Sequence, residues 1–152
     1  MMKNILVLCT GNSCRSQIAE GWLRYYAGGD AKVYSAGIEA HGLNKFAVRV
    51  MADAMIDISD HSSKKVDELP DIEFDYVITV CDNAKEKCPY YPGKTTLIHK
   101  SFPDPSQFKG TDKEIISKFE ALRDEIEDFC FDFIHNNIKP LIPYDLDNVL
   151  RM

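Results

Sequence analysis

One eight-residue stretch constrains the fold of this chain more than any other. It is Cys9 to Ser16, which reads Cys-Thr-Gly-Asn-Ser-Cys-Arg-Ser. The apolar run before it, residues 5–8, is too short for a helix and predicts a buried strand. After it, one face of a predicted helix over residues 17–27 carries Ile18, Ala19, Trp22, Leu23 and Tyr26. The stretch is therefore expected to be a loop at the carboxyl end of a strand, leading into a helix.

The residue types in this loop suit the binding of a small oxyanion. Gly11, Asn12 and Ser13 are small or tolerate left-handed backbone, so successive N–H groups can turn toward one centre. The helix N-terminus adds unpaired N–H donors and the positive end of its dipole. Arg15 adds a planar guanidinium that matches two oxygens of a tetrahedral anion. The predicted substrate-binding residues are Thr10, Gly11, Asn12, Ser13, Cys14, Arg15 and Ser16.

Cys9, at the base of the loop, is the predicted nucleophile. Positive surroundings favour a thiolate over a thiol, and Ser16 can donate a hydrogen bond to the sulfur. The alternative is a buried structural cysteine beside a helix-capping serine. The combination of strand, glycine and helix around the cysteine favours the nucleophile.

Length and charge limit the classes of partner. A chain of 152 residues suits one domain with a single core. Its 18 basic and 24 acidic residues give a net charge of −6, which argues against nucleic acid and acidic membrane surfaces as partners. No apolar run approaches the ~20 residues of a membrane span, and no signal peptide is visible before the first strand. We therefore expect a cytoplasmic protein.

Strand-like and helical segments alternate along the rest of the chain. Further strands are predicted at residues 32–36, 76–80 and 95–99. Helices are predicted after the capping residue Asn44, over a short stretch from Ser62 or Ser63 to Leu69, and over about residues 112–136 behind the capping box of Thr111 and Glu114.

This alternation predicts an α/β fold: a three-layer, flavodoxin-like parallel sheet of about four strands with helices on both faces. Ligands of such folds bind outside the carboxyl ends of the strands, where Cys9 and Cys81 both lie. Residues 1–137 are expected to form the catalytic domain. Residues 138–152, with two prolines, are expected to be an extension of unknown role.

Cys81 and Cys88 form a second group of thiols. Six residues separate them, of which five are polar or charged and one is alanine. A zinc site that joins them to Cys9 and Cys14 would need paired ligands two to four residues apart, so no metal is expected. Two inert core cysteines are the other alternative, which the charged neighbours of Cys88 disfavour. Five cysteines, an odd number, in a chain without an export signal suggest reduced, reactive thiols. We favour a pair that forms a disulfide during turnover.

Three segments together resemble the thioredoxin-coupled arsenate reductases of the low-molecular-weight protein tyrosine phosphatase superfamily. They are Cys-Thr-Gly-Asn-Ser-Cys-Arg-Ser-Gln-Ile-Ala-Glu-Gly-Trp from Cys9, Val-Tyr-Ser-Ala-Gly-Ile-Glu-Ala-His-Gly from Val33, and Val-Cys-x₆-Cys-Pro from Val80. The likeness covers roughly residues 3–135. It implies reduction of arsenate to arsenite by a cysteine nucleophile and a disulfide cascade that thioredoxin regenerates. The implied partners are arsenate and thioredoxin, with no cofactor and a monomeric chain.

The resemblance also implies a role for each candidate residue. The residue that matches the attacking cysteine is Cys9, and the matching arginine is Arg15. Cys81 and Cys88 match the two resolving cysteines. Asp104, in an Asp-Pro pair, matches the acid that protonates the leaving hydroxide.

One departure concerns a potassium ion that some family members bind near the loop. Groups that match Asn12, Glu20 and Ser35 hold it, together with an aspartate whose position is taken here by Lys64. If Lys64 lies near Glu20, its ammonium would replace the ion. The alternative is that Lys64 points into solvent.

The rival enzyme is a low-molecular-weight phosphatase that hydrolyses aryl phosphates. Such phosphatases resemble this chain in the loop and the Asp-Pro acid. They usually place a tyrosine after the Asp-Pro pair and wall the pocket with aromatic rings. Here Ser106 and Gln107 follow, and residues 35–41 supply no ring except His41. A non-catalytic anion-binding or redox-sensing module is a third possibility.

Overall fold

The computed structural model describes residues 2–82 and 95–141. In chain order its elements are β1 (Lys3–Cys9), α1 (Arg15–Ala27), β2 (Ala31–Gly37), α2 (Lys45–Asp53), the 3₁₀ turn η1 (Val66–Glu68), β3 (Tyr76–Thr79), β4 (Thr96–His99), the 3₁₀ turn η2 (Pro105–Gln107) and α3 (Asp112–Asn137). The predicted strands and the three long helices are confirmed to within one or two residues at most ends.

The four strands form one parallel sheet in the order β2-β1-β3-β4. The central strand β1 pairs with β2 on one side, where Cys9 lies opposite Gly37, and with β3 on the other. Residues 5–9 of β1 are buried, as expected for a central parallel strand covered on both faces. The predicted flavodoxin-like sheet is confirmed, and the carboxyl ends of β1 and β3 lie side by side.

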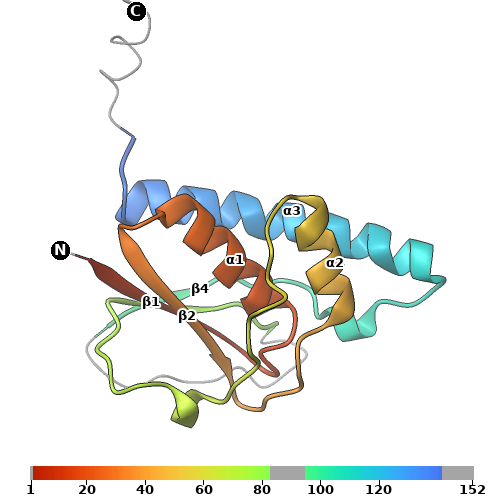
Figure 1. Ribbon diagram of the computed structural model, residues 1–152, viewed down its shortest axis with the longest axis horizontal. Helices are drawn as coiled ribbons and strands as arrows, with labels where there is room; N and C mark the ends of the chain where they lie inside the picture. Colours follow the sequence, from red (N-terminus) through yellow and green to blue (C-terminus); the bar gives the residue numbers. More distant parts are fainter. Residues whose placement is uncertain (1, 83–94, 142–152) are drawn as a thin grey trace, which may run out of the picture.

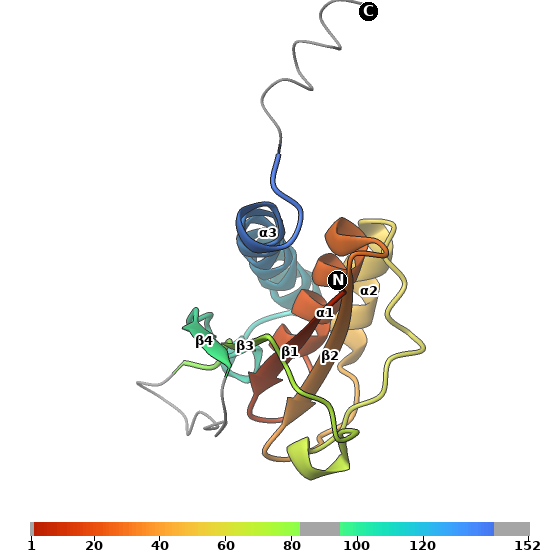
Figure 2. The same ribbon diagram turned by 90° about the vertical axis from the view of Figure 1, so that its left-hand side faces the viewer.

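The α-helices of the described residues, α1, α2 and α3, all lie on one face of the sheet (Figures 1 and 2). On this face Ile5 and Val7 of β1 pack in the main core with the apolar stripes of α1 and α3. The stripe of α3 includes Phe119 and Ile126, and the predicted capping box of Thr111 and Glu114 is present.

In the described residues the opposite face carries no α-helix, although the prediction placed helices on both faces. Leu6 and Leu8 pack there against Phe74 and Val77. The described segment that covers them, residues 59–75, contains η1 and no α-helix. The short helix predicted up to Leu69 is therefore reduced to three residues.

The physical reason is that backbone N–H and carbonyl groups before η1 form hydrogen bonds with other parts of the chain. The Lys64 N–H donates to Asn12 Oδ1 at 2.9 Å, and the Lys64 carbonyl accepts from Gly37 N at 2.9 Å. The Ser62 carbonyl accepts from Gln17 Nε2 at 3.2 Å. These groups bind the loop and its neighbours, so they are not available for helical hydrogen bonds.

Within residues 2–82 and 95–141, no helix is long and apolar enough to cross a membrane.

Candidate active site

The loop between β1 and α1 is held from behind by buried polar side chains. Asn12 has a positive φ of 47° and is fully buried. Its Nδ2 donates to Ser16 Oγ and to Ser35 Oγ, both at 2.9 Å. The Ser35 hydroxyl in turn donates to Glu20 Oε1 at 2.5 Å. An asparagine tolerates the left-handed backbone, and its amide fixes the curve of the loop.

Cys9 ends β1 at the floor of this loop and is 2% exposed. Its Sγ lies 3.1 Å from the Oγ of Ser16, in the first turn of α1. The predicted contact between serine and sulfur is therefore present. A hydroxyl that donates to the sulfur stabilises a thiolate more than a thiol.

Arg15 and Asp104 come together from distant parts of the chain. Arg15 starts α1 and is 4% exposed, and its guanidinium donates to the Phe102 carbonyl at 3.3 Å. One Asp104 oxygen lies 3.9 Å from Arg15 Nη2. The Asp104 side chain also accepts from Ser106 N and so caps η2. This cap keeps the carboxylate beside the loop.

These side chains line one pocket with a volume of about 250 Å³, just below the ~300 to ~1,000 Å³ that is usual for sites of organic ligands. A pocket of this size suits a small ion more than a large organic molecule. Its lining consists of Cys9, Thr10, Gly11, Ser13, Cys14, Arg15, His41, Asn44, Asp104, Pro105 and Ser106.

The other free thiols differ from Cys9 in their surroundings. Burial raises the pKa of Cys14 to about 12, although Ser13 and Arg15 act in the opposite direction. Cys130, on α3, is fully buried, and its Sγ lies 3.7 Å from the Ala19 carbonyl. Burial raises the pKa of Cys130 well above the ordinary value for a thiol. Neither thiol is set up as a ready nucleophile.

Cys81 lies two residues beyond the end of β3 and is fully buried. It is disulfide-bonded in this structure. The Val80 N–H donates to the Leu8 carbonyl at 3.0 Å, so Cys81 and Cys9 leave the sheet from neighbouring strands. Cys88, the other predicted resolving cysteine, lies outside the described residues.

Comparison with known proteins identifies the family. The family model described as low molecular weight phosphotyrosine protein phosphatase matches residues 4–140. The chain belongs to this family. An arsenate reductase from Bacillus licheniformis is 51% identical over 126 residues, which cover 82% of this chain and 89% of the relative.

Solved structures of the same fold give the same grouping. A structure of an arsenate reductase in the phosphate-binding state is 26% identical, with a TM-score of 0.69, and the match covers 89% of this chain and 98% of that one. A low molecular weight protein tyrosine phosphatase from T. tengcongensis, 23% identical with a TM-score of 0.68, covers 88% and 99% and shows the shared fold. The resemblance to the arsenate reductases of this phosphatase family is confirmed.

The structure separates the loop residues of this family member into two groups. Five of the seven predicted substrate-binding residues line the pocket. Asn12 and Ser16 lie behind the loop, fully buried, and hold its shape.

Four residues line the pocket that were not among the predicted site residues. Pro105 and Ser106 directly follow Asp104, and the other two are Asn44 and His41. Asn44 was expected as a helix cap; it caps α2, and its N–H also donates to the Ser13 carbonyl at 3.2 Å. His41 was noted only as the one ring in its segment. The signal for both was the proximity of residues 35–44 to the end of the strand beside β1.

Of the two alternatives for Lys64, the structure supports the one in which its ammonium does not pair with Glu20. The Lys64 ammonium is exposed and donates to the Ser62 carbonyl at 3.0 Å, which agrees with the alternative that it points into solvent. Glu20 is paired instead with Arg24 at 2.9 Å and faces His61 at 3.5 Å. The alignment correctly places residue 64 beside Asn12, but the contact is made by the backbone N–H of Lys64. The sequence could not show that the side chain takes no part in it.

The same contacts bear on a potassium ion. Asn12 Oδ1, the Ser35 hydroxyl and both Glu20 oxygens already have protein partners. The Arg24 guanidinium, 2.9 Å from Glu20, would repel a second cation, so this set of oxygen atoms does not fit a potassium ion. Within the described ranges, no group of three or more His, Cys, Asp and Glu side chains is placed to hold a metal ion.

Proposed function

We propose that this chain reduces arsenate to arsenite with electrons that a thioredoxin supplies through a disulfide cascade. The carrying observation is the small pocket in which a buried cysteine, a buried arginine and a carboxylate face one another. Arsenate has the size, charge and tetrahedral shape that such a loop binds. The names of the relatives support arsenate as the substrate.

In the first proposed step, arsenate binds with two of its oxygens on Arg15. The Cys9 thiolate attacks arsenic, and one hydroxide leaves as water with a proton from Asp104. The loop N–H groups and Arg15 stabilise the charge on the oxygens as it develops, and such preorganised electrostatics often contributes more to catalysis than any other effect. Proton transfer by the acid typically contributes ~10² to ~10⁴ in rate.

In the second proposed step, the Cys81 thiolate attacks the sulfur of the Cys9 adduct. The sulfur–arsenic bond breaks, its electron pair stays on arsenic, and arsenite leaves. The Cys9–Cys81 disulfide then exchanges with the Cys88 thiolate, which frees Cys9. The two thiols of thioredoxin reduce the resulting Cys81–Cys88 disulfide, so two electrons pass from thioredoxin to arsenic. The position of Cys9 and Cys81 at the ends of neighbouring strands supports this order.

The proposal also covers the cellular setting. A cycle that depends on reduced thiols and thioredoxin suits the cytoplasm. We expect a monomer without a cofactor, with residues 1–137 as the catalytic domain.

The alternative is an aryl phosphatase, since Cys9, Arg15 and Asp104 would serve a phosphate ester as well. The described lining of the pocket has no aromatic ring except His41 to stack on an aryl group. This observation favours the inorganic oxyanion.

The test is arsenate-dependent oxidation of NADPH through thioredoxin reductase and thioredoxin, compared with hydrolysis of an aryl phosphate. Wild type should turn over arsenate, whereas Cys81→Ser and Cys88→Ser should each stop within one cycle. Peptide mapping after one equivalent of arsenate should find Cys81–Cys88 in wild type and Cys9–Cys81 in Cys88→Ser. Cys130→Ala, a thiol deletion on α3, is the matched control and should sustain turnover.

The phosphatase alternative makes the opposite prediction for the same variants. Neither Cys81→Ser nor Cys88→Ser would then greatly change aryl phosphate hydrolysis, because that reaction has no disulfide step. If pure protein treated with one equivalent of arsenate keeps all its thiols free and leaves the arsenate unreduced, the proposal that it is an arsenate reductase is wrong.

A further inference from the structure

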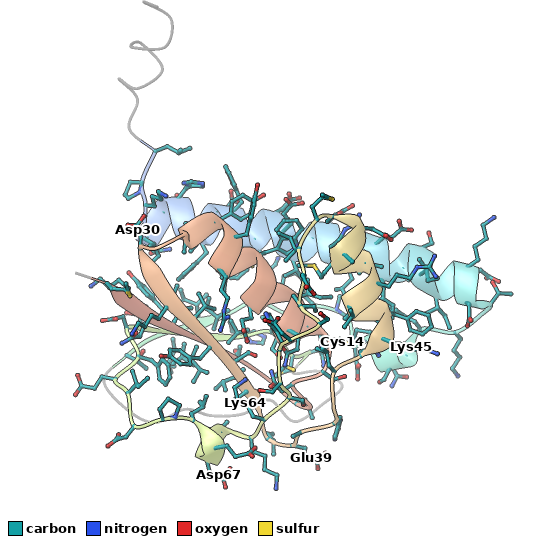
Figure 3. All side chains as sticks on the ribbon, in the orientation of Figure 1. Cys14, Asp30, Glu39, Lys45, Lys64 and Asp67 are labelled. Atoms are coloured by element: carbon teal, nitrogen blue, oxygen red, sulfur yellow. The ribbon has the colours of Figure 1, made fainter. Side chains whose placement is uncertain are left out.

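The segment between β2 and α2 places His41, whose side chain is 55% exposed, at the mouth of the pocket. The Glu39 N–H donates to the Thr10 carbonyl and the His41 N–H donates to the Gly11 carbonyl, both at 3.0 Å. Two consecutive carbonyls of the anion-binding loop therefore bind this segment. Figure 3 shows Glu39 on this connection, at the edge of the sheet where the loop lies.

The ring of His41 has one nitrogen on a carboxylate and the other toward the loop. Nε2 hydrogen-bonds to Glu39 Oε2. Nδ1 is turned toward Gly11, where even a β-carbon would overlap with it. The loop thus keeps a glycine where the ring lies closest, and His41 lines the same pocket as Cys9 and Arg15.

This arrangement determines where a second proton on the ring would go. A carboxylate at Nε2 keeps a proton on that nitrogen. Protonation of the ring then occurs at Nδ1, on the side of the loop, and creates a cationic donor there. Histidine is the side chain that ordinarily changes charge between about pH 5 and pH 8.

We propose that His41 is a proton-linked binding residue for the substrate anion. Entry of a doubly charged tetrahedral oxyanion recruits one proton from solvent to Nδ1, and the imidazolium, backed by Glu39, binds the anion together with Arg15. This inference rests on the proposed function only in taking the pocket as an oxyanion site. It adds a second cation and a pH dependence that the proposed mechanism does not contain.

A test of this proposal must exclude proton uptake by the other titratable groups around His41. Arg15 keeps its charge at all relevant pH values, and burial raises the pKa of Cys14 to about 12. The ammonium of Lys45 lies over the Phe46 ring, and that of Lys64 binds Ser62. Two groups in the pocket remain that can exchange protons with a bound anion. They are Cys9 and Asp104.

The experiment therefore uses full-length Cys9→Ser/Asp104→Asn protein and measures sulfate binding by calorimetry. Sulfate stays doubly charged between about pH 5.5 and pH 8, so a pH dependence reports protein groups. The affinity should fall about tenfold over this range, as linkage to one proton allows. Titrations in two buffers of different ionisation enthalpy should show uptake of about half a proton per sulfate near the middle of this range, as a tenfold change through one group requires.

Adding His41→Gln should weaken sulfate binding about tenfold at about pH 5.5 and abolish both the pH dependence and the proton uptake. His135→Gln, which removes a histidine at the far end of α3, is the matched control and should change neither. Absence of proton uptake in the parent protein would refute the inference without any variant at position 41. An unchanged pH dependence in folded His41→Gln would refute it too. If the parent protein does not bind sulfate at either pH, the oxyanion site and the proposed function fail together.

Discussion

Glu20 is a buried carboxylate whose two oxygens are both engaged by the protein itself. One accepts from the Ser35 hydroxyl at 2.5 Å, and the other pairs with Arg24 at 2.9 Å and faces His61 at 3.5 Å. A buried charge is costly without such partners. The guanidinium of Arg24 thus supplies the positive charge that a bound cation would otherwise provide.

This geometry predicts that potassium has no specific effect on the protein. Turnover of arsenate and the melting temperature should be equal in potassium chloride and sodium chloride at the same ionic strength. The reason is that a cation would have to displace Arg24 and the Lys64 N–H from oxygens they already bind. A rise in either quantity that follows potassium and not sodium would contradict the saturated site.

Single residues were predictable from sequence where the pattern is local. The contact between Cys9 and Ser16 was predictable because both belong to one loop of eight residues. The position of the Arg15 guanidinium at the loop was predictable because Arg15 begins the helix that follows. Asp104 came from family resemblance, because 89 residues separate it from Arg15 and no periodicity joins them. Arg24 pairs with Glu20 four residues earlier on the same helix, a local spacing, whereas the contacts of Glu20 with Ser35 and His61 depend on tertiary packing and could not be read from the sequence. The catalytic roles themselves stay predictions.

At the scale of elements, the end of β2 is pressed against the loop. A β-carbon on Gly37 would lie 2.7 Å from the carbonyl oxygens of Thr10 and Glu39 and 2.8 Å from the Asn12 nitrogen. All three are backbone atoms, which cannot rotate away. This close approach allows the segment with Glu39 and His41 to hydrogen-bond to the loop.

Gly37→Ala should therefore disturb the loop itself. We expect a loss of ~1 to ~3 kcal/mol in the free energy of unfolding, as for overpacking, and weaker binding of phosphate. Gly29→Ala is the matched control, because a β-carbon there meets nothing within 4 Å. Its unfolding free energy should change by less than about 0.5 kcal/mol. Urea unfolding and phosphate titration check both, and equal behaviour of the two variants would show that the close approach is unimportant.

Helices and strands were predictable where the spacing of their apolar residues matches the residues that are buried in the core beside the sheet. β1 and the stripe of α3 follow this rule, and their predicted positions are confirmed. The segment from Ser62 to Leu69 carries helix-compatible residues, yet its backbone donors and acceptors bind Asn12 and Gly37. Local propensity cannot reveal that a backbone is used by another part of the chain.

At the scale of the whole molecule, α1 and α3 pack against each other over the sheet, and among the described helices this contact is the most extensive. Figure 2 shows both helices on the same side of the strands. The Tyr26 hydroxyl donates to Glu127 at 2.5 Å, and its ring packs edge-on against Phe131 on α3. Burial raises the pKa of Tyr26 well above the ordinary value, and the neighbouring Glu127 carboxylate raises it further. This bond joins the first helix of the chain to the last.

Tyr26→Phe should lower the free energy of unfolding by ~1 kcal/mol near pH 8, because the ring contacts stay and the hydrogen bond is lost. The difference from wild type should depend on pH in one direction. In the unfolded chain the tyrosine ionises near pH ~10, whereas in the folded protein it holds its proton to higher pH. The unfolded state then binds fewer protons, so the contribution of Tyr26 to stability is complete below pH ~10 and is lost as the pH rises further.

Urea unfolding at about pH 8 and about pH 10.5 should show that the difference in unfolding free energy between wild type and Tyr26→Phe becomes smaller at the higher pH. Tyr25→Phe, at a neighbouring ring that is 62% exposed, should track wild type at both pH values, and a gap for Tyr26→Phe that does not close would show that Glu127 has no such influence.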